Sequence, residues 1–149
     1  MKIIRTSNIH KDFIELTAHL DSELNARYGQ QQSIYDVHNK IDPIDTAIVG
    51  YIDDFPVACG CFKRSDNDTI EIKRMYVRKV YRRKGFSTII LQSLENWGGE
   101  LGFIKALLET GKGQPEAIAF YQKEGYHVIE NYGPYKSMEN SICMEKFLN

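Results

Sequence analysis

The segment between Thr69 and Glu109 constrains the fold of this chain most strongly. The run TIEIKRMYV is rich in the β-branched and aromatic residues of a strand, and IKALLE is a second, shorter apolar run. Between the two runs, apolar residues recur at three- and four-residue steps from Ile90 to Leu101, and Gly102 closes the helix that this spacing predicts. A strand, a helix and a strand in this order predict a helix crossover between two strands of one sheet.

The region before this crossover predicts an antiparallel meander. IIRTS is typical of a short strand, and apolar residues from Phe13 to Leu24 form one face of a helix that begins near Ser7 or Asn8. TAIVGYIDDFPVACGCFK predicts two strands joined by an Asp-Asp turn, and the turn SDND leads into TIEIKRMYV. The segment RYGQQQSIYDVHNKIDP is polar and irregular.

The region after the crossover adds a helix and two strands. Pro115 opens the helix, Gly125 ends it, and the strands YHVIE and SICMEKF follow, separated by the loop NYGPYKSMEN. A chain of 149 residues with 42% hydrophobic content can bury one core. We therefore expect a mixed α/β fold of the α+β class, with a single domain over residues 1–149.

The overall composition gives no reason to expect a nucleic-acid or membrane partner. The 19 Lys and Arg residues nearly balance the 20 Asp and Glu residues, so an anion site has to be local. Cys59, Cys61 and Cys143 lack the spacing of a zinc site and favour reduced thiols, with the first two on one face of a strand. Because no signal peptide and no run of roughly 20 apolar residues is seen, we expect a soluble, cytoplasmic protein. Since neither the cysteines nor the histidines form a metal-ligand pattern, no metal is expected.

A local excess of positive charge lies at the start of the crossover helix. Seven of the 12 residues from Lys73 to Lys84 are basic and none is acidic. Backbone N–H groups and the positive end of the helix dipole converge there, and Gly85 permits close approach of a ligand, so the turn suits phosphate oxygens. Ser87 and Thr88 could cap the helix or bind the same anion. A solvated basic turn and a nucleic-acid contact are the alternatives, although no further basic face extends the patch.

Two blocks of the sequence resemble the GNAT superfamily of acetyl-CoA-dependent N-acetyltransferases. The stretch YVRKVYRRKGFS is similar to the acetyl-CoA-binding motif, with Arg82 and Gly85 at matching positions and Ser87 in place of the final Gly or Ala. The block LLETGKGQPEAIAFYQKEGY resembles the later motif of the family, with Gln114 where an Asn is often found. The resemblance covers about residues 48–147, in the element order of the family.

This resemblance implies a sheet with an antiparallel meander and a central parallel pair, flanked by helices, and acetyl-CoA as the acyl donor. The basic turn would bind the pyrophosphate of CoA, and the pantetheine arm would enter between the parallel strands, which splay apart at their C-terminal ends. A bulge in the first of these strands would leave an N–H free for the thioester carbonyl. The residues expected to contact CoA are Met75, Tyr76, Val77, Arg82, Arg83, Lys84, Gly85, Phe86, Ser87, Thr88, Gln114, Ala117, Phe120 and Tyr121.

Proton transfer needs two further groups. An alkyl amine is mostly protonated at neutral pH, so its attack on a thioester requires a base or a water wire. Glu71 is the first candidate for the base and Glu109 is the second. The structural alternative for Glu71 is an ion pair with Lys73 or Arg74. Tyr121 matches the general acid of the family for the leaving thiolate, and its alternative is a packing role.

The two aromatic residues of the last predicted helix are expected to have different roles. Phe120 and Tyr121 point about 100° apart on a helix, so Phe120 can anchor the helix in the core while Tyr121 faces the gap between the parallel strands.

The four histidines form no metal-binding or nucleophile pattern. Cys59 and Cys61 lie within a strand and have no base placed by the sequence, so direct transfer in a ternary complex is expected instead of an acyl-enzyme.

The expected function is transfer of an acetyl group from acetyl-CoA to a primary amine of a small molecule or protein. The alternative is an acyl-CoA-binding sensor without turnover. RYGQQQSIYD and NYGPYKSMEN are expected to line the acceptor site, since they carry tyrosines and amides without a dominant charge. A homodimer is an open alternative to a monomer.

Overall fold

The computed structural model describes residues 1–28 and 43–149. Most of RYGQQQSIYD therefore lies outside the described residues. The strands are β1 (Lys2–Thr6), β2 (Ala47–Ile52), β3 (Phe55–Arg64), β4 (Thr69–Val77), β5 (Lys105–Gly111), β6 (His127–Ile129) and β7 (Ser141–Phe147). The helices are α1 (Lys11–Tyr28), α3 (Phe86–Glu100) and α4 (Pro115–Lys123), with short 3₁₀ turns at η2 (Lys79–Tyr81) and η3 (Gly133–Tyr135). Within the described ranges, no helix combines the length and the apolar character needed to cross a membrane.

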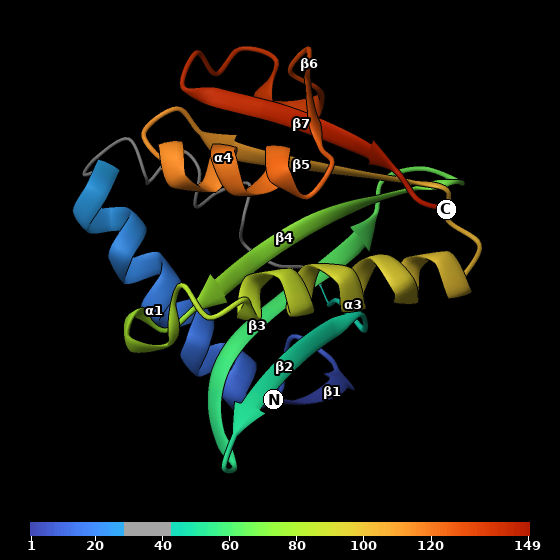
Figure 1. The fold of residues 1–149 in the computed structure, drawn as a ribbon. Coiled ribbons are helices and arrows are strands. Elements are labelled where there is room, and N and C mark those ends of the chain that lie inside the picture. The colour runs from blue at the N-terminus through green and yellow to red at the C-terminus, as the bar shows by residue number, and fades with distance from the viewer. Residues whose placement is uncertain (29–42) are drawn as a thin grey trace.

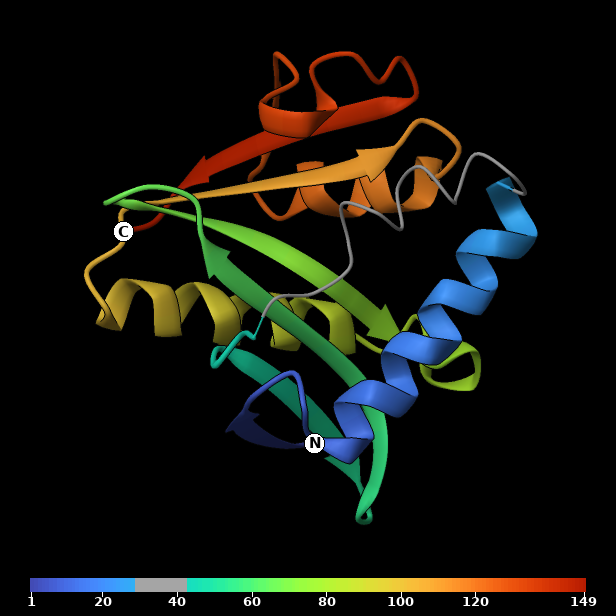
Figure 2. The same ribbon diagram turned by 180° about the vertical axis from the view of Figure 1, so that it is seen from behind.

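The seven strands form one sheet in the order β1-β2-β3-β4-β5-β7-β6. β1 to β4 make the predicted antiparallel meander, and β4 and β5 are a parallel pair joined through α3. Figures 1 and 2 show α3 and α4 on one face of the sheet and α1 on the other. This mixed sheet flanked by helices confirms the predicted fold class, and the parallel pair confirms the crossover.

The central strands have a buried cluster on each face, because successive side chains of a strand point to opposite sides. The cluster under α3 includes Ile48, Phe62, Ile70, Ile90 and Leu94. The cluster under α1 includes Phe13, Leu16, Val49, Cys59 and Cys61. Cys59 and Cys61 thus share one face, as the sequence predicts, and each buried Leu, Ile or Phe stabilises the fold by roughly 1.5–3 kcal/mol.

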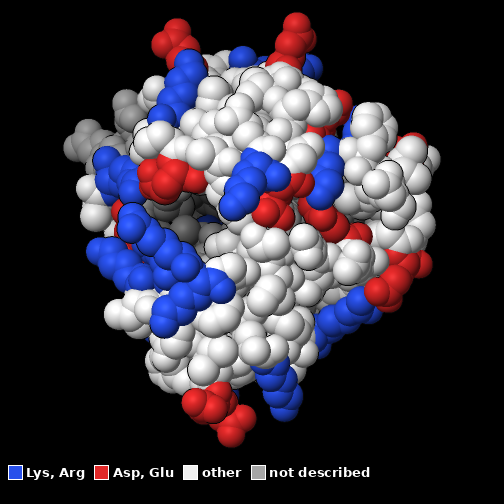
Figure 3. Space-filling model, in the orientation of Figure 1, with Lys and Arg blue, Asp and Glu red and all other residues white. Residues whose placement is uncertain are grey.

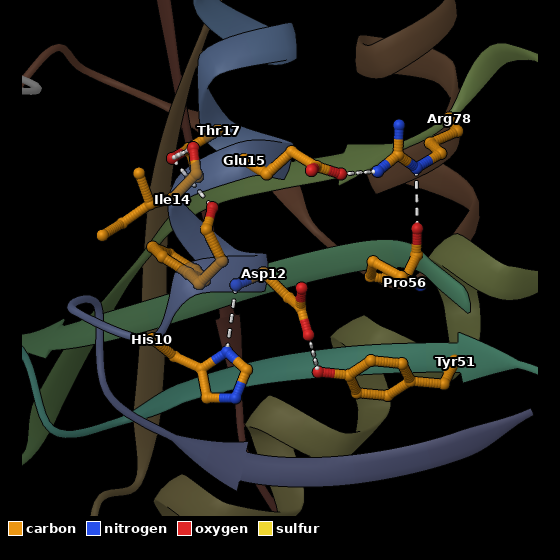
Figure 4. Close-up of polar contacts among 9 residues, drawn as sticks. His10, Asp12, Ile14, Glu15, Thr17, Tyr51, Pro56 and Arg78 are labelled. Atoms are coloured by element: carbon orange, nitrogen blue, oxygen red, sulfur yellow. Dashed lines mark hydrogen bonds and ion pairs between the residues drawn. The ribbon is translucent and has the colours of Figure 1, made fainter. Parts of the chain in front are cut away.

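Polar contacts attach α1 to the sheet (Figure 4). The hydroxyl of Tyr51 in β2 donates to Asp12 at 2.6 Å. Arg78, directly after β4, forms an ion pair with Glu15 and donates from Nε to the carbonyl of Pro56 at 2.7 Å. Since these contacts join α1 to β2, β3 and the end of β4, the helix is held against that face of the sheet.

The helix α1 begins at Lys11, later than the start predicted near Asn8. Asn8 exchanges two hydrogen bonds with Ile44: its backbone N–H donates to the Ile44 carbonyl at 2.9 Å, and its Oδ1 accepts from the Ile44 N–H at 3.2 Å. Its side chain is therefore engaged across the chain instead of capping the helix. Nδ1 of His10 instead accepts the N–H of Asp12 at 3.1 Å, within the first turn (Figure 4).

A bulge interrupts the pairing of β3 with β4. The register shifts between Cys59 and Cys61, where Arg74 and Met75 of β4 lie opposite Gly60 of β3. Arg74 has φ +60°, a left-handed conformation that is uncommon outside glycine. Two residues opposite one is the pattern of a β-bulge, which bends the strand and removes backbone groups from the regular ladder. The bulge that the family resemblance implies is therefore present in β4.

The parallel strands β4 and β5 diverge after a short paired segment. Their registered pairs run only from Thr69 opposite Lys105 to Glu71 opposite Leu107, although β4 continues to Val77. Figure 1 shows the two strands separating toward their C-terminal ends. The splay that the resemblance implies is thus confirmed, and it leaves part of both strands without a partner along that edge.

Candidate active site

A cavity of about 140 Å³ occupies the opening between the diverging strands, and we call it the inner cavity. Its walls come from α1, β4, β5, α4 and η3, and they include an apolar side and several ionisable groups. The lining residues are Leu20, Leu24, Glu71, Ile72, Lys73, Arg74, Met75, Leu108, Glu109, Thr110, Gly111, Gln114, Ala117, Tyr121 and Tyr135.

A second hollow, of about 320 Å³, lies at the turn between η2 and α3, and we call it the outer hollow. Its lining residues are Val77, Tyr81, Arg82, Arg83, Gly85, Phe86, Ser87, Thr88, Phe120 and Lys123. Neighbouring positions of α4 divide between the two spaces, because Tyr121 lines the inner cavity and Phe120 lines the outer hollow. Figure 3 shows Lys and Arg side chains gathered over the turn between η2 and α3, beside a depression in the surface.

The N-terminus of α3 presents free backbone donors to the outer hollow. Gly85 is the N-cap, no side chain of residues 1–28 or 43–149 caps the helix, and its first turn contains no acidic residue. The hydroxyl of Thr88 donates to Glu124 at 3.1 Å, so the capping role considered for Ser87 and Thr88 is not observed. Gly85 has φ +82°, and a Cβ there would meet no atom within 4 Å, so backbone conformation and not crowding favours glycine. This end of the helix has the properties of an anion site.

The basic side chains of this turn have different surroundings. Arg83 and Lys84 are exposed. Arg82 is held by the protein: its Nε donates to the carbonyl of Val77 at 2.8 Å, and its Nη2 lies 2.8 Å from a carboxylate oxygen of Glu23 in α1. The motif arginine therefore links α1 to the end of β4 in this structure.

Glu71 lies at the inner cavity and is almost fully buried, with 5% of its surface exposed. Its Oε2 accepts a hydrogen bond from the hydroxyl of Tyr132 at 2.9 Å and a longer one from Tyr135 at 3.4 Å. Lys73 lies 4.0 Å from the same oxygen, and Lys63 lies 3.7 Å from Oε1. The ion pair with Lys73 that the sequence offered as an alternative is therefore present within the cavity.

Glu109 lies at the same cavity but in different surroundings. It is partly buried, and among the described residues only Ser141 hydrogen-bonds to it, at 2.8 Å from the serine Oγ to Oε2. Burial raises the pKa of Glu109 to about 7, and the charge of Glu71 adds to this, against the opposing effects of Ser141 and Lys73. Burial also lowers the pKa of Lys73, although Glu71 acts in the other direction. The cavity therefore holds two carboxyl groups with unlike hydrogen-bond partners and unlike burial.

Tyr121 presents its side chain to the inner cavity from α4. It is buried and faces the gap between the diverging strands, as expected from the sequence. Phe120 packs against the core only in part, because it also lines the outer hollow. Burial raises the pKa of the Tyr121 phenol, and no hydrogen bond or charge among the described residues contributes to that shift. A phenol with a raised pKa keeps its proton at neutral pH and can donate it.

A buried polar cluster lies behind Tyr121. Tyr126 packs edge-on against the Tyr121 ring, with centroids 5.8 Å apart, and its backbone N–H donates to the Tyr121 carbonyl at 2.9 Å. The Tyr126 hydroxyl donates to Glu95 at 2.8 Å, and Lys146 lies 3.0 Å from the other oxygen of that carboxylate. Because both oxygens of the buried carboxylate are bonded, this cluster supports the position of Tyr121.

The bulge residue Arg74 also carries a buried guanidinium. Its Nη2 lies 2.9 Å from Asp21 and donates to the Thr17 carbonyl at 3.1 Å, while Nε has no partner among the described residues. Arg74 therefore pairs with α1 and not with Glu71, which removes one of the two partners considered for that carboxylate.

Most residues expected to contact CoA line one of the two spaces. The inner cavity has Met75, Gln114, Ala117 and Tyr121, and the outer hollow has Val77, Arg82, Arg83, Gly85, Phe86, Ser87, Thr88 and Phe120. Lys84 is exposed on the same turn. The side chain of Tyr76 belongs instead to the cluster under α1, where its hydroxyl donates to Glu23. Only its backbone remains for a contact with a ligand between the strands.

Several residues at the cavity have no evident role in the sequence alone. The loop NYGPYKSMEN is expected near the acceptor, and Tyr135 does line the cavity, but its bond and that of Tyr132 to Glu71 could not be predicted. Leu20 and Leu24 appear in the sequence as a helix face, and here that face covers the cavity. The only signal for this contact in the sequence is the pair of tyrosines itself, seven and ten residues after Gly125.

Neither a metal centre nor a reactive thiolate is found among the described residues. No three His, Cys, Asp or Glu side chains gather there as a metal site would require. The three cysteines are buried and free, and burial raises the pKa of Cys61 to about 12 and that of Cys143 to about 11. Thiols with such pKa values remain protonated and are weak nucleophiles at neutral pH.

Comparisons with known proteins agree with this geometry. The model of the acetyltransferase (GNAT) family matches residues 12–126. An IAA acetyltransferase of Azospirillum brasilense is 28% identical over 146 residues, which cover 97% of this chain and 95% of that protein. A Klebsiella pneumoniae protein provisionally classed as an acyl-CoA N-acyltransferase is 26% identical, with a TM-score of 0.82 and coverage of 99% and 97%.

A more distant structure shares the fold. The PaiA N-acetyltransferase of Thermoplasma acidophilum, solved in complex with coenzyme A, is 17% identical, with a TM-score of 0.70 over 98% of both chains. At this identity the likeness concerns the arrangement of strands and helices.

Proposed function

The chain belongs to the acetyltransferase (GNAT) family, and on this premise we propose that it transfers an acetyl group from acetyl-CoA to a primary amine by direct attack in a ternary complex. The observation that carries the proposal is the adjacency of two spaces: an anion site at the N-terminus of α3, and a cavity between splayed strands that holds proton donors and acceptors. A long ligand with phosphates at one end and a reactive group at the other suits this pair of spaces.

The outer hollow would hold the pyrophosphate of CoA. The backbone N–H groups from Phe86 to Thr88 and the positive end of the α3 dipole favour phosphate oxygens. Arg83 and Lys84 are exposed on the same turn, so they can add positive charge to the site. These groups supply affinity for the cofactor and take no part in the reaction itself.

The inner cavity would hold the pantetheine end and the acceptor amine. Acetyl-CoA supplies an activated thioester carbonyl when it is bound. Backbone groups of Met75 and Val77 lie on the part of β4 that has no β5 partner, so they are available to a strand-like ligand. The bulge at Arg74 and Met75 would direct an N–H at the thioester oxygen, where negative charge develops during attack. Gln114 and Ala117 would line the path from α4.

Two proton transfers complete the reaction. Tyr121 would donate its proton to the departing sulfur, because its phenol remains protonated at neutral pH. A carboxylate of the inner cavity, Glu71 or Glu109, would remove a proton from the incoming ammonium group. General acid and base groups of this kind each contribute typically 10²- to 10⁴-fold to a rate.

The proposal is tested by release of the CoA thiol from acetyl-CoA with a panel of alkylamines, amino acids, polyamines, aminoglycosides and peptides. Turnover with at least one amine, together with an increase in mass of 42 Da on that amine, is the expected result; the increment is about the mass of an acetyl group less one hydrogen. Thermal stabilisation by acetyl-CoA without turnover of any panel amine would favour the acyl-CoA sensor instead.

A further inference from the structure

The two carboxyl groups of the inner cavity differ in how many of their lone pairs are already used. Both oxygens of Glu71 face donors or cations: Tyr132 and Lys73 lie at Oε2, and Lys63 lies at Oε1. Because these contacts engage both carboxylate oxygens, an incoming ammonium group would have to displace one of them to reach Glu71. Glu71 is also nearly inaccessible, with 5% of its surface exposed.

Glu109 offers the opposite combination. It is the more exposed of the two, and Ser141 bonds only to Oε2, which leaves Oε1 without a partner among the described residues. Its position near the end of β5 is on the side where β4 and β5 have separated, within the cavity that the acceptor has to enter. An accessible oxygen with an unused lone pair is the geometric requirement for a general base.

We propose that Glu109 removes the proton from the acceptor ammonium group, and that Glu71 is a positioning residue that acts on Glu109 through its charge. This assignment rests on the proposed function and deepens it. In the step itself, the N–H bond of the acceptor breaks, its electron pair stays on nitrogen for attack on the thioester carbonyl, and the proton moves to Oε1 of Glu109.

The charges around Glu109 support this division. From β4, Glu71 raises and Lys73 lowers its pKa, and from β7 the Ser141 hydroxyl lowers it, while burial has the largest effect. Tyr135 and Cys143 also face this carboxyl, and both keep their protons at neutral pH because burial raises the pKa of each. The balance places the pKa of Glu109 at about 7, where a base is both partly free and strong enough to accept a proton.

The experiment is the pH dependence of kcat/KM at saturating acetyl-CoA for the wild type, Glu109→Gln, Glu71→Gln and Ser141→Ala. The probe acceptor is n-butylamine, the simplest alkylamine of the panel, and any panel amine with faster turnover is measured beside it. The activity of the wild type is expected to fall as the pH drops below about 7, since kcat/KM for the amine reports the base of the enzyme form to which the amine binds. We call this decrease the acid limb. Glu109→Gln should lower kcat/KM by about 10²- to 10⁴-fold at neutral pH and abolish this limb.

The other two variants should move the limb in opposite directions. Glu71→Gln removes a negative charge near Glu109, so the limb should shift to lower pH with a smaller loss of rate. Ser141→Ala removes a hydrogen bond that stabilises the Glu109 carboxylate, so the limb should shift to higher pH. A purely structural role of either residue would lower the rate without moving the limb, and these two variants keep the test decisive if Glu109→Gln does not fold.

The outcomes separate this inference from the proposed function. Absence of turnover with every amine contradicts the proposed function and the role of Glu109 together. Turnover with an acid limb that survives in Glu109→Gln, or that disappears in Glu71→Gln, leaves the function intact and overturns the assignment of Glu109.

Discussion

Nη2 of Arg82, a residue that lines the outer hollow, lies 2.8 Å from Oε1 of Glu23, so the arginine of the basic motif is paired with α1. The Arg82 side chain is 39% exposed and that of Glu23 is 35% exposed. Ion pairs that are this accessible contribute about 0–1 kcal/mol, so a phosphate group can compete with Glu23 for the arginine. The ion pair with Glu23 therefore opposes a contact between the Arg82 guanidinium and a phosphate group by only a small free energy.

Replacement of this carboxylate should strengthen cofactor binding. In Glu23→Gln, Arg82 loses its anionic partner, and we expect CoA to bind about 2- to 5-fold more tightly, which corresponds to the upper part of the range for an exposed pair. Isothermal titration calorimetry at fixed ionic strength measures the change, with Glu15→Gln, which removes the partner of Arg78, as the matched control on α1. Weaker binding in Glu23→Gln would show instead that the pair orients Arg82 for the cofactor.

The turn at Gly85 should determine cofactor affinity through its backbone. Gly85→Glu adds a side chain and a negative charge at the N-cap of α3, so the increase in melting temperature caused by CoA or desulfo-CoA should disappear. Gly99→Glu, at an exposed position of the same helix with open space around its Cα, is the control and should retain the shift. A shift that persists in Gly85→Glu would remove this turn from the cofactor site.

Tyr121 should affect the rate and not the fold. Tyr121→Phe keeps the ring that packs against Phe120 and Tyr126 and removes only the hydroxyl. We expect kcat to fall by at least ~10-fold, with the affinity for CoA and the melting temperature nearly unchanged, because the lost interaction forms mainly in the transition state. If the variant turns over at the wild-type rate, Tyr121 is a packing residue.

Tyr126→Phe should show the complementary behaviour. Its hydroxyl donates to the buried carboxylate of Glu95, so its removal leaves one carboxylate oxygen without that bond and should lower the free energy of unfolding by about 1–3 kcal/mol. Chemical denaturation measures this loss, and Tyr121→Phe is the matched control with the same change of one hydroxyl. Equal stability of Tyr126→Phe and the wild type would mean that Lys146 alone satisfies Glu95.

The raised pKa of Glu109 has a consequence for stability. The ordinary pKa of the group is 4.5 and the folded value is about 7, so the folded state binds more protons than the unfolded state between these pH values. The free energy of unfolding should therefore fall as the pH rises through this window. Glu109→Gln does not titrate, so the stability of the variant relative to the wild type should increase by roughly 3 kcal/mol between pH 4.5 and pH 8. Parallel curves for the two proteins would contradict the raised pKa.

The sequence predicts the local elements because their signals are local. The period of the apolar residues from Ile90 to Leu101 and the alternation in TIEIKRMYV and SICMEKF depend on neighbours a few positions away, and these elements lie where expected. The basic turn with its glycine is also contiguous, so the anion site that we propose there could be predicted before any tertiary contact was known. The predicted start of α1 was wrong because the Asn8 side chain accepts a hydrogen bond from Ile44, a residue far along the chain, instead of capping the helix.

Tertiary structure alone decided which chemistry each side chain can perform. In the sequence, Glu71 and Glu109 are two carboxylates at strand positions, and Glu71 had the stronger case as the base. Their difference arises when the loop after β6 brings Tyr132 onto Glu71 while β7 brings only Ser141 to Glu109. Those contacts join residues 61 and 32 positions apart, and they depend on the register of β7 against β5, which no short pattern encodes. Proton affinity follows burial and neighbouring charge, so it belongs to the folded arrangement and not to the residue type.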